Sequence, residues 1–371
     1  MLVRRPLVER PFFSICIPQH NRTSFLLEVC RSLDAQTFRG FEVCISDDCS
    51  TDGRGEELLD FLQRSGLSFA YRRLETNLRY DGNLRSAIEL ASGRYAFLLG
   101  NDDALKNATT LQELHDTMAG MPEAAVVFTN FEDFSTGQVT RRVPATSVMG
   151  SGPAVAAACF RKFSFIGGVI LATGPAQSAA VERWDRSEMY QMYIGCRLIA
   201  SGGILTEVDL VTVRKDVQIR GEVVDSFARK PRLALNGIPL QSLPLCQTAR
   251  LVIDAIEPYV TTNRTVIHLN VMFQYFGFLY PYWLLQYRRV QSWRFAAGLC
   301  RAMQPHRSLA DVKLSLLGNV CTTTVYVLAS VLGLTVPVSL LDRIQRPAAR
   351  IARFVGNWGT ALANPSTPAK G

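Results

Sequence analysis

The stretch GRYAFLLGNDDAL, from Gly93 to Leu105, indicates the fold of this chain. Its centre, Tyr95–Leu99, is a short and mostly apolar run, which predicts a buried strand. This strand leads directly into Gly100 and the polar cluster Asn101–Asp103. Two adjacent carboxylates at the end of a buried strand are costly unless a cation lies there. The stretch therefore predicts either a divalent metal site that holds a phosphate or an ordinary polar turn.

Similar apolar segments precede and follow this stretch, and helical patterns separate them. The segments expected to form strands are Pro11–Pro18, Phe41–Ser46, Leu67–Arg73 and Ala124–Thr129. Strands that alternate with helices of this length predict an α/β fold, with a mostly parallel, Rossmann-like sheet flanked by helices.

Polar clusters follow three of these strands. They are Gln19–Asn21 after Pro18, Asp47–Asp48, and Asn101–Asp103. In open parallel sheets, ligands bind at the carboxyl ends of the strands. We therefore expect the three clusters to meet at one edge of the sheet and to form a ligand site there.

The charge is distributed unevenly along the 371 residues. Residues 226–371 carry 16 Lys and Arg against 4 Asp and Glu, a net charge of +12, whereas residues 1–225 carry 24 against 28, a net charge of −4. This asymmetry predicts an acidic catalytic part followed by a part that meets an anionic partner. The nine scattered cysteines are typical of cytosolic proteins, and the N-terminus shows no secretory signal pattern.

Four segments together carry a family resemblance: Ser14–Arg22, Ala35–Gly53, Glu75–Tyr95 and Phe97–Asp103. Their order and spacing resemble the nucleotide-binding half of family 2 glycosyltransferases, which have the GT-A fold. The Gly before the acidic cluster, with Asn77, Gly82 and Asn83, is similar to the branch that acts on bacterial surface polysaccharides, including O-antigen abequosyltransferases. The resemblance implies a nucleotide-sugar-binding half over residues 1–105 and an acceptor-binding half over residues 106–225.

The resemblance also implies which residues bind the nucleotide-sugar donor. His20 would stack on the base, Asp48 would accept a hydrogen bond from it, and Arg79 would lie beside the base and phosphates; a planar guanidinium suits that role. Asp47 is expected to be a structural cap instead. The complete expected donor set is Pro18, Gln19, His20, Asn21, Asp48, Arg79, Asn101 and Asp102.

The acidic cluster departs from the Asp-x-Asp motif that most family members carry. Here Gly100 or Asn101 replaces the first Asp, but Asp102 and Asp103 remain. The resemblance implies that Asp103, with Asp102 beside it, binds a metal ion that bridges the diphosphate. Oxygen-only ligands of this kind suit Mn²⁺ or Mg²⁺.

Inverting transferases of this fold need a carboxylate that takes the proton from the acceptor hydroxyl. The family's acidic pair would fall on Tyr190 and Gln191, which cannot act as bases at neutral pH, in the helical pattern Ser187–Gly203. Glu188, expected in the first helical turn, is the first candidate, and Asp185 is the second. Both could instead be ordinary helix-start carboxylates favoured by the helix dipole.

The strand and helix alternation stops near residue 225. Residues 265–287 and 314–341 are uncharged apolar runs, each long enough to span a bilayer, but the basic loop between them opposes a spanning hairpin. Ile344–Trp358 has the pattern of a basic amphipathic helix, which favours a membrane-surface location. Residues 226–371 are therefore expected to be a helical, membrane-associating region. Alternatively, both apolar runs are core helices of a bundle.

Together these patterns predict a metal-dependent inverting glycosyltransferase, peripheral on the cytoplasmic face of the inner membrane. It would move a sugar from a nucleotide-diphosphate donor to a membrane-held, polyprenyl-linked saccharide. The alternatives are a transferase that glycosylates polyprenyl phosphate itself, and a non-enzymatic scaffold that only binds sugar nucleotides. Nucleic-acid binding is not expected, because the basic residues are interleaved with long apolar runs.

Overall fold

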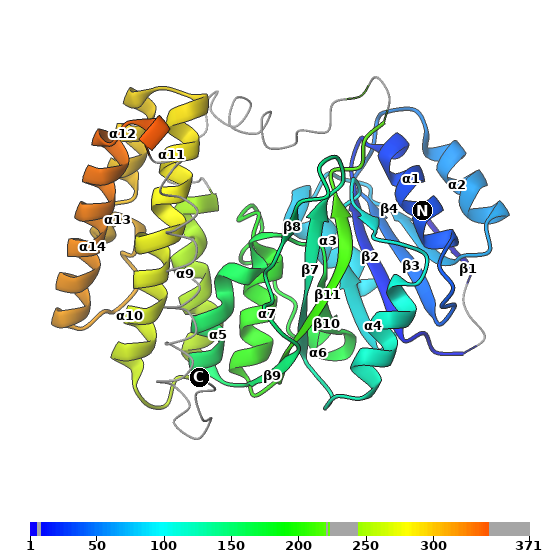
Figure 1. Ribbon diagram of the computed structural model, residues 1–371, viewed down its shortest axis with the longest axis horizontal. Coiled ribbons are helices and arrows are strands. Elements are labelled where there is room, and N and C mark those ends of the chain that lie inside the picture. The colour runs from blue at the N-terminus through cyan, green and yellow to red at the C-terminus, as the bar shows by residue number, and fades with distance from the viewer. Residues whose placement is uncertain (6–8, 220–221, 223–243, 341–371) are drawn as a thin grey trace. The chain divides into compact units, whose positions relative to one another are not determined.

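The computed structural model describes residues 1–5, 9–219, 222 and 244–340. The chain forms two compact units (Figure 1). The sheet unit consists of residues 1–150 and 162–224, and the helical unit consists of residues 151–161 and 225–371. The short segment 151–161 thus belongs with the C-terminal part of the chain, although it lies between two stretches of the sheet unit.

One sheet runs through the sheet unit in the order β1-β4-β3-β2-β5-β10-β7-β11-β6, with β8 paired to β7 and β9 to β11. Its strands are β1 (Leu2–Arg5), β2 (Phe13–Gln19), β3 (Phe41–Asp47), β4 (Ser68–Arg73), β5 (Tyr95–Leu98), β6 (Ala104–Leu105), β7 (Val126–Asp133), β8 (Val139–Thr140), β9 (Ser147–Gly150), β10 (Val169–Ala172) and β11 (Leu205–Lys215).

The direction of the strands changes across this sheet. β4, β3, β2 and β5 are parallel to one another, as the alternation of strands and helices predicts. β10 is antiparallel to both β5 and β7, and β1 is antiparallel to β4. The α/β fold is confirmed, but the sheet is mixed: it is parallel only in the part that carries the expected ligand edge and in the β7–β11 pair.

Helices cover the sheet through apolar stripes. α1 buries Phe25, Leu26, Val29 and Leu33, which recur at the three- and four-residue spacing of a helix face. The core beneath includes Phe13, Ile15 and Val43, all fully buried, and all nine cysteines are unpaired. The helices of this unit are α1 (Thr23–Asp34), α2 (Gly55–Arg64), α3 (Arg79–Glu89), α4 (Thr110–Ala119), α6 (Thr173–Ser178) and α7 (Tyr190–Ala200).

The described part of the helical unit is a bundle. Its helices are α5 (Pro153–Cys159), α9 (Pro244–Ile256), η3 (Glu257–Tyr259), α10 (Arg264–Gln274), η4 (Tyr275–Leu279), α11 (Tyr280–Val290), α12 (Trp293–Ala302), α13 (Pro305–Ser308) and α14 (Leu316–Thr335). The 3-10 helix η1 (Phe160–Ser164) follows α5 where the chain returns to the sheet unit.

The two apolar runs differ in this bundle. The run 265–287 forms α10, the π-helix η4 and most of α11, and Tyr275, Phe276 and Tyr280 are completely buried in it. It is a core element, in line with the alternative stated above. Among the described helices, α14 alone is long and apolar enough to cross a membrane, judged by length and composition. The predicted amphipathic helix Ile344–Trp358 lies outside the described residues.

Candidate active site

The carboxyl ends of β2 and β3 lie side by side. Gln19 pairs in register with Asp47, and the backbone N–H of Asp48 donates to the Gln19 carbonyl (2.9 Å). His20 Nδ1 lies 2.8 Å from the Asp48 carbonyl. Because a carbonyl can only accept, Nδ1 carries the proton in this contact. The first two predicted clusters are therefore joined by hydrogen bonds.

The third cluster joins them through Gln19. The Asn101 side-chain amide donates to Gln19 Oε1 (2.7 Å), and the Asn83 amide of α3 donates to the Gln19 carbonyl (2.9 Å). Gln19 is buried, so each of these bonds replaces one that water would otherwise make. The expected convergence of three strand ends on one edge is confirmed, and we refer to this place as the donor edge.

The two carboxylates at the end of β3, Asp47 and Asp48, have different partners. Asp47 accepts from the Ser50 backbone N–H (2.8 Å) and from the Tyr71 hydroxyl (2.7 Å). Asp48 accepts from the Leu78 backbone N–H (2.6 Å), and burial raises its pKa above the ordinary value. Asp47 thus caps the turn, as predicted. Asp48 instead connects the turn to the start of α3.

The other expected donor residues lie around this pair. Pro18 is buried within β2. His20 and Asn21 are exposed at the start of the following loop, where Asn21 has φ +51° and its backbone N–H donates to Ser50 Oγ (3.0 Å). Arg79 is exposed at the first position of α3, with φ +60°. A positive φ is costly for residues other than glycine, so the chain holds both loops in specific conformations.

The acidic pair lies at the same edge. Asp102 forms an ion pair with Arg22, the residue that precedes α1. Asp103 is only 3% exposed, and its Oδ1 accepts from the Asp216 backbone N–H (3.2 Å), just beyond β11. A Cβ on Gly100 would lie 2.6 Å from Asp103 Oδ2, so any larger residue at this position would displace one of the two carboxylates.

The charges of this pair are poorly compensated within the protein. Burial raises the pKa of Asp102, although Arg22 opposes the shift. Burial and the neighbouring Asp102 raise the pKa of Asp103 well above its usual range. Among the described residues no three His, Cys, Asp or Glu side chains form a metal-binding group. One buried and one half-buried carboxylate still suit a hard divalent cation whose other ligands are phosphate and water oxygens.

The carboxylates expected on the acceptor side lie before α7. This helix begins at Tyr190, so Glu188 is not in its first turn, contrary to the prediction. Glu188 is exposed in the preceding loop with φ +56°, and its backbone N–H donates to Asp81 Oδ2 (2.8 Å). Asp81 Oδ1 accepts from the Tyr190 N–H (3.0 Å), so this buried side chain of α3 supplies the cap that sets where α7 begins.

Asp185, the second candidate base, has a strong partner. Its two oxygens accept from Arg85 Nη1 (2.6 Å) and Nη2 (3.0 Å), in a bidentate ion pair with a mostly buried guanidinium. Such a pair favours the charged carboxylate and fixes its direction. Burial, in contrast, raises the pKa of Asp81 to about 6. Of the candidates, Glu188 is the exposed carboxylate.

The sequence model described as Glycosyl transferase family 2 matches residues 14–166, which include β2, β3, β5 and the acidic pair. Residues 14–166 thus carry the sequence pattern of a family 2 glycosyl transferase domain. The resemblance inferred from the sequence is therefore confirmed for this part of the chain.

Two curated relatives agree with the family 2 domain. Abequosyltransferase RfbV of Salmonella typhimurium is 42% identical over 96 residues, which is 25% of this chain and 28% of RfbV. Amylovoran biosynthesis glycosyltransferase AmsB of Erwinia amylovora is 25% identical over 243 residues, which is 61% of this chain and 80% of AmsB. This chain thus matches little more than a quarter of the length of RfbV. RfbV is named as an abequosyltransferase, and AmsB is named as a glycosyltransferase of amylovoran biosynthesis.

Two solved structures share the GT-A fold of the domain. Staphylococcus aureus TarS 1–349 in complex with UDP has a TM-score of 0.56 at 16% identity, covering 86% of this chain and 90% of TarS 1–349. Mannosyltransferase PcManGT of Pyrobaculum calidifontis, solved with GDP-Man and Mn²⁺, has a TM-score of 0.51 at 15% identity, covering 94% of this chain and 88% of PcManGT. These likenesses support the fold. They also show that proteins of this fold bind a nucleotide and a divalent metal.

Three residues that contribute to this site were not predicted from the sequence: Arg22, Asp81 and Asp216. Arg22 directly follows the polar cluster Gln19–Asn21, and the expected meeting of this cluster with Asp102 and Asp103 could have indicated the ion pair between Arg22 and Asp102. Asp81 and Asp216 act on Glu188 and Asp103 across 107 and 113 residues of sequence. No local pattern connects residues so far apart, so only the fold shows these contacts.

Proposed function

We propose that this chain transfers a sugar from a nucleotide-diphosphate donor, with inversion, to a hydroxyl of a saccharide acceptor in surface polysaccharide biosynthesis. The observation that carries the proposal is the donor edge, where Asn101, the residue before the acidic pair, binds Gln19, and His20 binds the Asp48 carbonyl, all within the region that matches family 2. Its relatives RfbV and AmsB support the sugar-transfer chemistry and the polysaccharide context.

In this proposal the donor lies along the donor edge. His20 stacks on the base, and Asp48 accepts a hydrogen bond from it. The contacts of Asp48 with Leu78 and of His20 with Asp48 hold both groups at the same place. Arg79 begins α3 next to Leu78, and its exposed guanidinium can reach the base or the phosphates. The other expected donor contacts come from the backbone of Pro18 and from Gln19, Asn21, Asn101 and Asp102.

Asp103, with Asp102 beside it, would hold Mn²⁺ or Mg²⁺. The metal would neutralise the charge that develops on the leaving nucleoside diphosphate. The raised pKa values of both carboxylates support this assignment, because a bound cation would compensate the charges that burial disfavours. Arg22 orients Asp102 and supplies a fixed positive charge beside it.

Glu188 is the proposed base that takes the proton from the acceptor hydroxyl. It is exposed and can meet a substrate, and Asp81 holds its backbone from α3. Asp185 is the second choice because both of its oxygens already bind Arg85. A base that deprotonates the acceptor hydroxyl lets its oxygen attack the anomeric carbon from the side opposite the leaving diphosphate, and such an attack inverts the configuration.

The proposed acceptor is a polyprenyl-linked saccharide at the cytoplasmic face of the inner membrane, where the chain is peripheral. Two features support this location. Residues 226–371 carry a net charge of +12, and α14 exposes an apolar face. A lipid-linked acceptor and an enzyme on the same membrane surface meet by diffusion in two dimensions.

A thermal-shift experiment tests the donor site. We expect UDP or GDP with Mn²⁺ to raise the Tm of the full chain, since a ligand that binds only the folded state stabilises it. Asp103→Asn should abolish the Mn²⁺-dependent part of this shift. It should also lower sugar transfer or donor hydrolysis on the order of a thousandfold, because a metal contributes several kcal/mol to the transition state.

Asp116→Asn is the matched control, since it removes an exposed carboxylate of α4. It should leave the shift and the rate unchanged. If the chain binds nucleotides but releases none from sugar donors, the proposed enzyme is wrong and the chain is the non-enzymatic scaffold. A full Mn²⁺-dependent shift in Asp103→Asn would contradict the metal assignment.

A further inference from the structure

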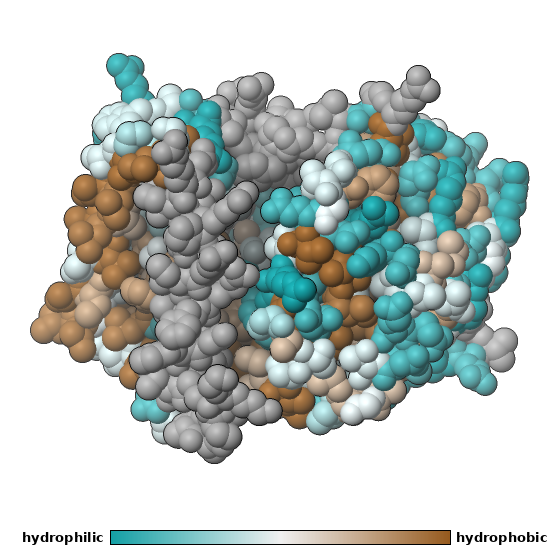
Figure 2. Space-filling view, in the orientation of Figure 1, coloured by the Kyte–Doolittle hydropathy of each residue, from teal (hydrophilic) through white to brown (hydrophobic). Residues whose placement is uncertain are grey.

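α14 places its large apolar side chains on the opposite face from a helix in a water-soluble bundle, which turns them inward. The residues that face the bundle are small or polar, apart from one tyrosine: Gly318, Thr322, Tyr326, Ala329, Ser330 and Gly333. The residues that face outward include large aliphatic side chains, each at least 46% exposed: Leu316, Leu317, Val320, Val327, Leu328, Val331 and Leu332. Figure 2 shows hydrophobic side chains gathered over this helix at the left edge of the view.

This arrangement is costly in water, where an amphipathic helix normally turns its large aliphatic residues inward. Helices in lipid, in contrast, pack through small residues and turn their large ones outward. A Cβ on Gly333 would lie only 2.4 Å from Leu284 Cδ2 of α11, so the helices approach closely there. The 20 residues of α14 make the exposed face about 30 Å long. A surface of this extent indicates a partner.

The C-terminal end of α14 carries the side chains that anchor proteins at a membrane interface. Arg288 of α11 donates to the carbonyls of Gly333 and Val336, the latter at 2.8 Å. Trp293 Nε1 donates to the Leu334 carbonyl (3.2 Å), and its ring is exposed. Arginine and tryptophan both combine an apolar body with a polar end that prefers the headgroup layer.

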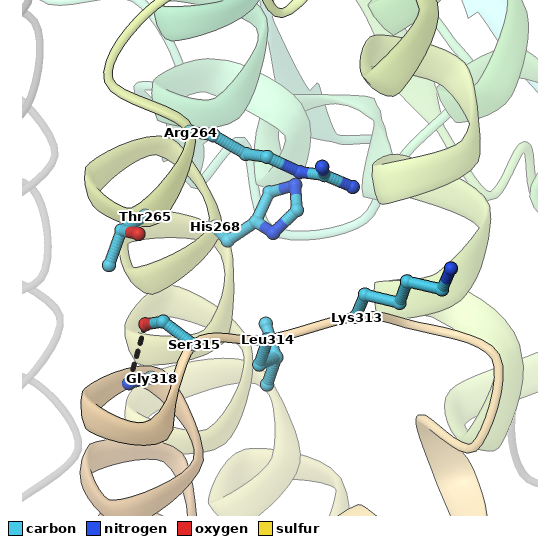
Figure 3. Close-up of a pocket in the computed structure, with 7 residues that line it drawn as sticks. All are labelled: Arg264, Thr265, His268, Lys313, Leu314, Ser315 and Gly318. Carbon is cyan, nitrogen blue, oxygen red and sulfur yellow. Dashed lines mark hydrogen bonds between the residues drawn. The ribbon is translucent and has the colours of Figure 1, made fainter.

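The N-terminal end of α14 borders a cationic cavity of about 210 Å³. Its lining includes Arg264, His268 and Lys313, whose polar ends lie around the same space in Figure 3. Ser315 caps α14 there by accepting from the Gly318 N–H (3.1 Å). The first turns of α10 and α14 both begin at this cavity, and helix N-termini carry partial positive charge.

Glu257 compensates only part of this charge. It pairs with Arg264 and with His268, whose Nε2 lies 2.7 Å from Glu257 Oε2. Lys313 forms no ion pair with any described residue. Over the range 264–340 the sequence has seven Lys and Arg against one acidic residue, Asp311, a net charge of +6. The surroundings of the apolar face thus complement an anionic surface.

We propose that the outward face of α14 binds the hydrocarbon of an anionic lipid bilayer and that the cavity beside its first turn takes a lipid phosphate. The aliphatic stripe supplies the apolar contact, and the cavity and the Arg288–Trp293 end reach the headgroups. This deepens the proposed function, because it names the surface that holds the enzyme at the membrane of its acceptor. The proposed function gives this lipid contact its biological role, but the contact itself is tested without it, since lipid binding is measured without any sugar transfer.

Vesicle cosedimentation of the full chain tests the proposal. We expect strong binding to vesicles of phosphatidylcholine with phosphatidylglycerol and weaker binding to phosphatidylcholine alone. The double variant Leu328→Ser/Leu332→Ser should bind on the order of tenfold more weakly per leucine, because each loses apolar surface that lipid covers. Val139→Ser/Val148→Ser, which changes two exposed valines of the sheet unit, is the matched control and should bind like the wild type. Unchanged binding of the double leucine variant overturns the proposal.

The cavity is tested separately. Lys313→Gln should weaken binding to the phosphatidylglycerol vesicles about fivefold, the value expected for one cation near anionic lipid. It should leave binding to phosphatidylcholine alone unchanged. Arg64→Gln, on the exposed side of α2, is the control of equal charge. If inorganic phosphate instead binds the wild type as tightly as the vesicles do and displaces them, the cavity is a site for a soluble anion and not for a lipid.

Two rival occupants of the face give different results. If a second copy covers it, the wild type is a dimer without lipid, and the leucine variant becomes monomeric. If another segment of the chain covers it, the variant loses thermal stability as Leu299→Ser in the core of the bundle does. Either result overturns the proposal. Mn²⁺-dependent nucleotide binding should be unchanged in every variant, so failure of the lipid site and failure of the proposed function are distinguishable.

Discussion

The donor edge and α14 place their polar and apolar side chains by opposite rules. At the donor edge, apolar strands are buried and polar groups gather at their ends, where nearly every one has a partner in another loop. α14 directs its small residues inward and leaves large aliphatic ones exposed. The first arrangement is the usual one for a protein in water, and the second is the usual one for a helix in lipid. The difference teaches that the lipid contact proposed for α14 and the ligand site proposed at the donor edge can be tested independently of each other.

The largest effect is expected in the sheet unit, from Glu188→Gln. Removing a general base lowers the rate of transfer by about 10²–10⁴-fold. Nucleotide binding measured by thermal shift should remain, since Glu188 lies before α7 and not among the donor loops. Steady-state kinetics with a saccharide acceptor provide the measurement.

Asp185→Asn is the companion variant that decides between the two carboxylates. It breaks the bidentate contact with Arg85, so we expect a lower Tm with a small change in kcat. A large loss of kcat in Asp185→Asn with a normal rate in Glu188→Gln would reverse the assignment. Glu182→Gln, an exposed neighbour, should leave both properties unchanged.

An intermediate effect is expected from Asp81→Asn, and it depends on pH. Burial raises the pKa of Asp81 to about 6, above its value of about 3.9 in the unfolded chain. The folded protein therefore holds a proton that the unfolded chain releases between about pH 4 and pH 6. This contribution to stability, up to about 3 kcal/mol, is present at low pH and is lost as the pH rises.

Denaturant unfolding at several pH values measures this effect. The stability of the wild type relative to Asp81→Asn should fall between about pH 4 and pH 7. Asp116→Asn is the control, because hydrogen bonds from His115 and Gln112 lower the pKa of Asp116, and its trend has the opposite sign. A flat difference for Asp81→Asn would show that this carboxyl is not desolvated where it caps α7.

The smallest effect is expected on the other side of the comparison, from Gly333→Ala. The added methyl group meets Leu284, which is completely buried and has little room to move. After the gain in helix propensity, we expect a net cost of about 1 kcal/mol and a Tm lower by a few degrees. Thr324→Ala, on the exposed face of the same helix, is the control. A stabilising Gly333→Ala would mean that α14 does not need small residues to pack.

Much of the donor edge could be predicted from the sequence because its information is local. The strand ends follow from apolar runs that stop at polar clusters, and parallel strands bring those clusters to one edge. The start of α7 could not be predicted, because Asp81, far away in the sequence, supplies its cap. The mixed direction of the sheet was also missed. β10 is a run of only four residues, and no pattern within it fixes its direction.

The apolar character of α14 was visible in the sequence, but the outward direction of its large aliphatic side chains was not. Periodicity shows that one face differs from the other, whereas only the structure shows which face meets the bundle. Residues 265–287 have a similar composition and form the core. Two apolar runs of similar composition thus differ in burial: the first buries large side chains such as Phe276 and Tyr280, whereas α14 exposes Leu328 and Leu332.

The segment Ser151–Arg161 determines how this protein can be divided. It belongs to the helical unit but is inserted within the sheet unit, so the chain passes between the units after Gly150, after Arg161 and after Val224. Gln274 donates to the Ala157 carbonyl (2.8 Å) and accepts from Arg161 Nε (2.9 Å), which ties the insert to α10. The C-terminal bundle is therefore not a detachable module. A single recombination or truncation point near residue 225 would separate α5 from the helices that it contacts, so an exchange of one unit between relatives needs further crossover points near residues 150 and 161.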